Sequence, residues 1–194
     1  MKPICRDSTD SHLFLKPLRY RLGCACLFTT SGSVVSFKVP TTLKENKMIN
    51  GIAHLFTQLK ANIAELRGVK VSGFVDSTAA SCVTNRALQI CALDALLYVH
   101  RKKYANQLNG LGGKQALYHK LLLKYQWPLS VIRDLTLSDA LLALHDELQF
   151  DSLPDGVGEY FSQVARANYP VNFPDYLDAE WDPDLSEKFL IEIH

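Results

Sequence analysis

The sequence predicts an α+β protein that is predominantly helical, with one domain and an acidic C-terminal arm. Three observations predict this fold class. Two β-rich runs flank a glycine near the N-terminus, a strand-like run follows the first long helical pattern, and most of the remaining chain has helical periodicity. Of the 194 residues, 47% are hydrophobic and 21% are charged, which is typical of a globular protein.

The N-terminal part of the chain predicts a β-hairpin. Its two strands are residues 21–29 and 33–39, the turn between them contains Gly32, and Pro40 ends the second strand. A further strand is predicted at residues 69–75, where three valines occupy alternate positions that share one face of a strand.

Helices are predicted where apolar residues recur every three to four positions. The first runs from about Thr42 to Gly68, and the glycine supplies the stop. The second, residues 82–106, is apolar on nearly every side, so we expect it to be the central core helix. Further helices are predicted at residues 114–126, 137–149, 159–168 and 185–190.

Charge is distributed unevenly along the chain. Residues 1–145 contain 19 lysines and arginines against 8 aspartates and glutamates, whereas residues 146–194 contain 2 against 12. We therefore interpret residues 1–150 as a basic body and residues 151–194 as a short helix followed by an acidic arm, packed on or beside that body. The aromatic and leucine residues of the arm suit docking, either on the protein's own body or on a partner.

A basic cluster is the first candidate site. Tyrosines and a tryptophan lie among its lysines, a mixture that suits contact with single-stranded DNA or RNA. The alternative is that these cations complement the dipole at a helix C-terminus while the aromatic rings pack in the core. The candidate residues for nucleic-acid binding are Arg101, Lys102, Lys103, Lys114, Lys120 and Lys124.

The segment after the predicted third strand is the second candidate site. A loop of small polar residues before a helix presents backbone N–H groups that can bind an anion. The glycines and lysine of a phosphate-binding P-loop are missing, and the alternative is that Ser81 or Thr84 caps the helix. The candidate anion-binding residues are Asp76, Ser77, Thr78, Ser81 and Arg86.

No catalytic residue, metal site or cofactor is predicted. The six histidines are scattered and the five cysteines form no Cys-x-x-Cys pair. Neither a secretory signal nor a membrane-spanning apolar stretch is recognisable, so we expect a cytoplasmic protein without membrane contact.

Three hypotheses for function follow from these patterns. The first is a non-enzymatic regulatory or accessory protein that contacts nucleic acid through its basic body, with access modulated by the acidic arm. The second is a protein–protein adaptor or inhibitor that uses its helical half and the arm. The third is a small enzyme with an anion-binding loop at residues 76–86.

Overall fold

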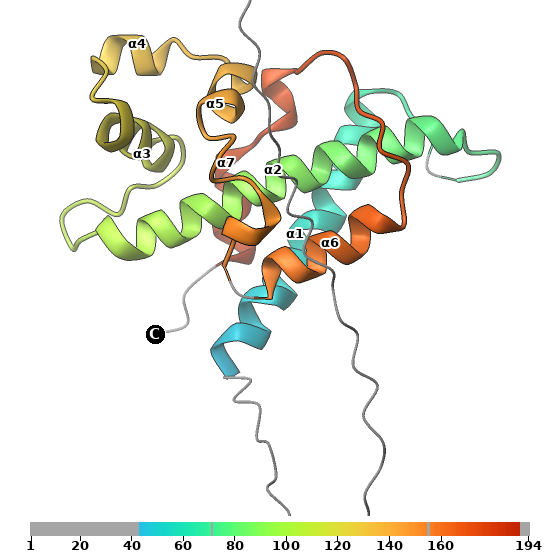
Figure 1. The fold of residues 1–194 in the computed structure, drawn as a ribbon, viewed down its shortest axis with the longest axis horizontal. Coiled ribbons are helices and arrows are strands. Elements are labelled where there is room, and N and C mark those ends of the chain that lie inside the picture. Colours follow the sequence, from blue (N-terminus) through green and yellow to red (C-terminus); the bar gives the residue numbers. More distant parts are fainter. Residues whose placement is uncertain (1–42, 71, 155, 191–194) are drawn as a thin grey trace, which may run out of the picture. The chain divides into compact units, whose positions relative to one another are not determined.

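The computed structural model describes residues 43–70, 72–154 and 156–190, all within the unit of the chain formed by residues 40–194. These residues form seven α-helices, two short 3₁₀ helices and no strand (Figure 1). The α+β prediction is therefore wrong for the described part of the chain, which is helical. The predicted hairpin at residues 21–39 lies outside the described residues. The helices are α1 (Leu43–Leu66), α2 (Ser77–Tyr104), α3 (Gln115–Tyr125), α4 (Leu129–Arg133), α5 (Leu137–Ala143), η1 (Phe150–Ser152), α6 (Val157–Arg166), η2 (Asp178–Glu180) and α7 (Pro183–Phe189).

Helices α1 and α2 pack against each other and form the centre of this unit (Figure 1). Helix α1 buries a stripe of apolar side chains, among them Ile52 and Ile63, whose spacing follows the helical period. After the helix ends, Gly68 has a φ of 65°, which glycine adopts without steric strain. The Val69 N–H then donates to the Ala64 carbonyl at 2.8 Å, which closes the helix end.

Helix α2 is the central core helix that the sequence predicts, although it begins five residues earlier, at Ser77. Its buried residues lie on almost every side. Besides two cysteines, they include one arginine, one aspartate and one histidine, namely Arg86, Asp94 and His100. Because burying a charge or a polar group without a partner is costly, each needs a partner from another part of the chain.

The helices that follow α2 cover its C-terminal half. Helix α3 packs on α2, and α4, which the sequence did not predict, packs on α3 (Figure 1). Helix α5 begins with a capping box, in which Thr136 and Asp139 each accept a hydrogen bond from the other's backbone N–H at 3.2 Å. The helix predicted for residues 137–149 ends at Ala143, and turns lead from there to η1.

The strand predicted at residues 69–75 is not formed. The described residues of this segment make bends and irregular structure between α1 and α2, and the Phe74 side chain is 96% exposed. Alternating valines fit one face of a sheet, but a strand is stable only when a second strand pairs with its backbone. No strand in the described residues is available for that pairing.

The chain returns to the central pair of helices after α5. Helix α6 lies so close to η1 that a Cβ atom on Gly158 would be 2.0 Å from the Phe150 carbonyl oxygen. The acidic arm then runs along α1 and α2 and ends in α7, which packs on α1. At that contact a Cβ atom on Gly51 would be 2.5 Å from the Phe189 carbonyl oxygen. The glycines therefore allow two close approaches that hold the C-terminal segments in place.

Long helices occur in the described part of the chain, but none of them is apolar enough to cross a membrane.

Candidate functional site

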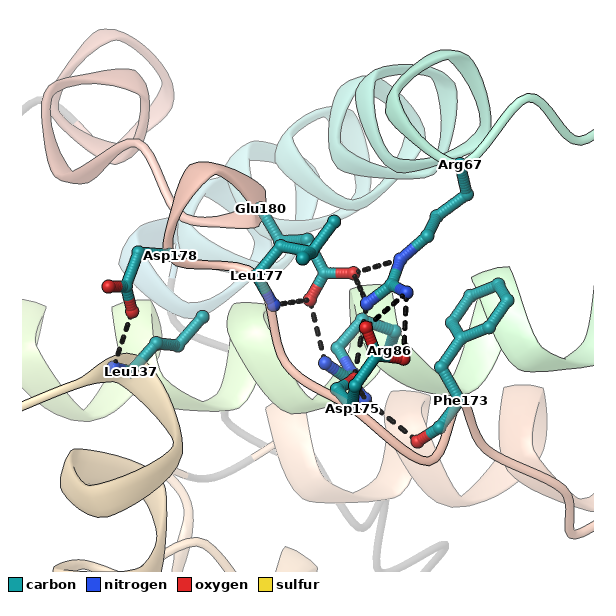
Figure 2. A network of polar contacts seen from close by, with 8 residues as sticks. All are labelled: Arg67, Arg86, Leu137, Phe173, Asp175, Leu177, Asp178 and Glu180. Carbon is teal, nitrogen blue, oxygen red and sulfur yellow. Dashed lines mark hydrogen bonds and ion pairs between the residues drawn. The ribbon is translucent and has the colours of Figure 1, made fainter.

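A buried ion pair attaches the acidic arm to helix α2. Glu180 in η2 accepts a hydrogen bond of 2.6 Å from Arg86, and both side chains are fully buried (Figure 2). The other terminal nitrogen of Arg86 donates to the backbone carbonyls of Phe173 and Asp175, at 3.1 and 2.9 Å. The guanidinium also lies over the ring of Tyr176, 3.6 Å from its centroid. Arg86 thus contacts the arm in three ways: through the Glu180 carboxylate, through two backbone carbonyls and through the ring of Tyr176.

Arg67, from the end of α1, contacts the same carboxylate from the other side. Its Nε donates to Glu180 at 2.7 Å, and one of its terminal nitrogens bonds to both carboxylate oxygens of Asp175, at 2.9 and 3.0 Å (Figure 2). Hydrogen bonds to Glu180 and Asp175 raise the pKa of Arg67 against the lowering effect of burial. Two arginines from different helices therefore share one buried glutamate.

A third buried contact joins the arm to α2 further along the helix. The indole N–H of Trp181 donates to the Asp94 carboxylate at 3.0 Å. Burial raises the pKa of Asp94 to about 7, although the Trp181 hydrogen bond and the charge of Arg101 act in the opposite direction. The arm is therefore packed into the core at this point rather than resting on the surface.

Near its end the arm also pairs with Arg101 and with a backbone N–H between α2 and α3. Glu187 lies 3.5 Å from the Arg101 guanidinium and accepts a hydrogen bond of 2.7 Å from the Gly113 backbone N–H. Arg67, Arg86 and Arg101 thus each contact a carboxylate of the arm. Part of the charge difference between body and arm is therefore balanced inside the protein.

The six predicted nucleic-acid-binding residues differ in their exposure and in their ion pairs. Lys102, Lys103 and Lys114 are exposed, whereas Arg101 pairs with the arm. Lys120 lies 2.6 Å from Glu147, which follows α5. Lys124 lies 2.5 Å from Asp146 and 3.1 Å from Glu147.

Three of those six residues lie around one cavity. Lys103 comes from the end of α2, whereas Lys120 and Lys124 come from α3, and all three line a hollow of about 370 Å³. We call it the lysine hollow. Arg101, Lys102 and Lys114 are not among its lining residues.

The predicted anion-binding residues are not gathered at one point. Asp76 is the N-cap of α2 and accepts a hydrogen bond of 2.8 Å from the Thr78 backbone N–H. Ser77 and Thr78 lie in the first turn of α2, and Ser81 is buried in the next turn. Arg86 lies further along α2, with its terminal nitrogens bonded to the arm.

A larger cavity than the lysine hollow lies between α2, α5, η1 and the start of the arm. It has a volume of about 720 Å³, within the range that ligand sites usually have. We call it the groove. Its lining contains no lysine, arginine, aspartate or glutamate and consists of Asn85, Leu88, Gln89, Ala92, Ser138, Leu141, Leu142, His145, Leu148, Gln149, Phe150, Ala165, Pro170, Asn172 and Tyr176.

Two carboxamide side chains of α2 face this groove. Asn85 and Gln89 lie four residues apart, which places them on one face of the helix. The Asn85 amide donates to the backbone carbonyls of Tyr169 and Val171, both at 2.7 Å. The Gln89 amide oxygen is buried and has no hydrogen-bond partner among the described residues. One end of the groove therefore already binds two backbone carbonyls of a tight turn, in which the Val171 N–H donates to the Tyr169 carbonyl at 2.8 Å.

In comparisons with family models, with curated proteins and with solved structures, nothing matches this chain. Its function is therefore argued from the geometry of its own residues.

The described residues contain no group of three or more histidine, cysteine or acidic side chains that could hold a metal ion. Ser138 and His145 both line the groove, but no hydrogen bond between described residues joins them. The sequence analysis did not identify the groove. Asn85 and Gln89, two amides four residues apart on a helix that is otherwise largely apolar, are the signal that could have found it.

Proposed function

We propose that this protein is a non-enzymatic adaptor that binds an extended, uncharged and largely apolar segment of a partner protein in its groove. The observation that carries the proposal is the composition of the groove, where most side chains are apolar, four are carboxamides and none carries a fixed charge. Apolar walls favour an apolar occupant, and a charged one would lose its hydration without gaining an ion pair.

The carboxamides favour a peptide over a plain hydrocarbon. Asn and Gln side chains both donate and accept hydrogen bonds, as the backbone of an extended peptide does. Asn85 already makes such contacts with the chain's own residues Tyr169 and Val171. The groove continues from this contact past Gln89, and two further carboxamides, Gln149 and Asn172, also line it.

A peptide library measured against two matched variants tests this proposal. Immobilised protein is screened with short peptides sorted into uncharged apolar, acidic and basic classes, and binders are measured again in solution. We expect the uncharged apolar class to bind. Leu142→Glu should remove binding, because this 75% exposed side chain lines the groove and its replacement adds a charge there.

Leu108→Glu is the matched control. Leu108 is 99% exposed in the turn after α2 and does not line the groove, so the same substitution there should leave peptide binding unchanged. A library in which no class is enriched would contradict the proposal. Equal binding by the Leu142→Glu protein would also contradict it.

The nucleic-acid hypothesis stays a prediction. The exposed Lys102 and Lys103 at the end of α2 favour it, whereas the carboxylate partners of Arg101, Lys120 and Lys124 weaken the positive field of the predicted surface.

A further inference from the structure

The lysine hollow brings chemistry-bearing groups from three segments together. Helix α2 supplies His100, Lys103 and Tyr104, helix α3 supplies Lys120 and Lys124, and the turn after α5 supplies Glu147. The remaining lining residues are Leu96, Val99 and Leu123. Three ammonium groups and one carboxylate therefore face a single cavity of about 370 Å³. The cavity carries a net positive charge and belongs to no part of the proposed peptide groove.

We propose that the lysine hollow binds the phosphate group of a phosphate ester, with Lys103 and Lys120 as its main ligands. The proposal concerns a site separate from the peptide groove and does not depend on it.

An oxyanion already occupies part of this arrangement. The Glu147 carboxylate lies 2.6 Å from the Lys120 ammonium and 3.1 Å from that of Lys124. Burial opposes the ionisation of Glu147, yet hydrogen bonds from both lysines lower its pKa. The hollow therefore stabilises one carboxylate, that of Glu147, in the protein without ligand. The same lysines can bind the oxygens of a phosphate group.

Unused donor capacity remains around the cavity. An ammonium group has three N–H donors, and among the described residues Lys120 donates one hydrogen bond, to Glu147. Lys103 takes part in none of the ion pairs between described residues, and its ammonium lies 5.0 Å from the Tyr104 ring centroid. A phosphate group has enough acceptor oxygens for both lysines, and hydrogen bonds between charged partners are the strong ones.

The walls of the hollow indicate an ester rather than the bare ion as the natural ligand. Val99, Tyr104 and Leu123 are each at least 40% exposed at this site. They offer an apolar and aromatic surface next to the lysines. A phosphate ester with a flat organic group would place its phosphate on the lysines and its organic group on this surface.

A histidine pair at the base of the hollow supplies a spectroscopic reporter. The His100 Nε2 atom lies 2.9 Å from the His119 Nδ1 atom. Burial and the nearby charges of Lys120 and Lys103 together lower the pKa of His100 to about 4, against the raising effect of Glu147. An anion in the hollow would offset those lysine charges, so the pKa of His100 should rise when it binds.

The experiment titrates the whole protein with inorganic phosphate and follows the imidazole signals of His100 and His119 by NMR. We expect saturable shifts and a higher pKa of His100 with phosphate than with chloride at equal ionic strength. Shifts that stay linear with concentration, or equal shifts with chloride, would overturn the proposal.

Two variants with opposite expected effects separate binding from mere structural damage. Lys103→Gln should weaken phosphate binding about tenfold, because one charge-assisted hydrogen bond is lost. Glu147→Gln should strengthen binding several-fold, because it removes the competing carboxylate and frees both lysines.

Lys114→Gln makes the same charge change as Lys103→Gln on an exposed residue outside the hollow and should leave binding unchanged. Equal weakening by Lys103→Gln and Lys114→Gln would show a general charge effect and overturn the proposal.

Two further probes identify the source of the phosphate. Thymidine monophosphate presents a phosphate ester with a ring, and a short oligothymidylate presents phosphodiesters in a chain. Tighter binding of the monophosphate than of inorganic phosphate supports a small ester as ligand. Binding of the oligonucleotide that is weakened by Lys103→Gln supports a nucleic-acid strand. Failure of both probes to compete with inorganic phosphate would overturn the assignment of an ester.

Leu142→Glu should leave all of these results unchanged, because Leu142 lines the groove and not the lysine hollow. The phosphate proposal and the peptide proposal can therefore be contradicted separately.

Discussion

Arg86 and Glu180 are 94 positions apart in the sequence and form a fully buried ion pair with a 2.6 Å hydrogen bond (Figure 2). Arg67 contacts the same carboxylate at 2.6 Å. The acidic arm therefore supplies the counter-charge for a guanidinium in the centre of helix α2. The arm contributes a charged group to the core as well as covering the surface.

Glu180→Gln should destabilise the protein strongly. Removing one partner of a buried ion pair leaves an unbalanced charge in the core, which typically costs about 3–5 kcal/mol. We expect that loss in the free energy of unfolding measured in urea. Glu187→Gln is the control, because Glu187 is partly exposed and lies 3.5 Å from Arg101, and exposed pairs contribute only about 0–1 kcal/mol. Equal losses for the two variants would contradict the importance assigned to the buried pair.

Asp94 should make the protein less stable as pH rises from about 4 to about 7. Burial raises its pKa to about 7 from the ordinary value of 3.8, so the folded protein binds a proton that the unfolded chain has released. The stabilisation is complete below the unfolded value and is lost as pH rises through the folded value. We expect Asp94→Asn to remove this contribution, measured as the free energy of unfolding across that range.

The contribution of His100 to stability has the opposite pH dependence. The parent protein therefore has to be compared with Asp94→Asn. The pKa of His100 is lowered to about 4 from 6.5, so its contribution to stability is lost as pH falls through that interval. The two groups partly cancel in the parent protein. The difference between the parent and Asp94→Asn isolates Asp94, and a difference that does not change with pH would contradict its raised pKa.

Gly158→Ala should destabilise the contact between α6 and η1. A Cβ atom at this position would lie 2.0 Å from the Phe150 carbonyl oxygen, so the backbone would have to move. Overpacking of this kind typically costs about 1–3 kcal/mol. Gly110→Ala is the matched control, since a Cβ atom there has no neighbour within 4 Å. Thermal unfolding of both proteins measures the difference, and equal midpoints would contradict the prediction.

Local sequence patterns were sufficient for most of the helices. The apolar stripe of α1 and the stop at Gly68 predicted that helix to within a few residues, and the helix predicted from residue 137 begins there as α5. The valines at residues 69–75 misled because a period of two describes one face of a strand but says nothing about whether a second strand is present to pair with it.

Contacts between residues far apart in the sequence could not be predicted from such patterns. Opposite charges on the body and the arm suggested docking as one of two alternatives, but they could not select Glu180 as the partner of Arg86 or Trp181 as the partner of Asp94. Those choices depend on how the arm is positioned after α6. The lysine hollow has the same origin, because the cavity exists only when α3 packs on the end of α2.

The Arg86–Glu180 pair also has a consequence for the time course of biosynthesis. A ribosome adds about 5–20 residues per second, so roughly 5–20 s pass between the synthesis of the arginine and that of the glutamate. During that interval the nascent chain can form α1 and α2, but the Arg86 guanidinium has no internal counter-ion and stays hydrated. Completion of the core therefore waits for the last segment to be synthesised, and chains interrupted before residue 180 should remain open to proteases until they are cleared.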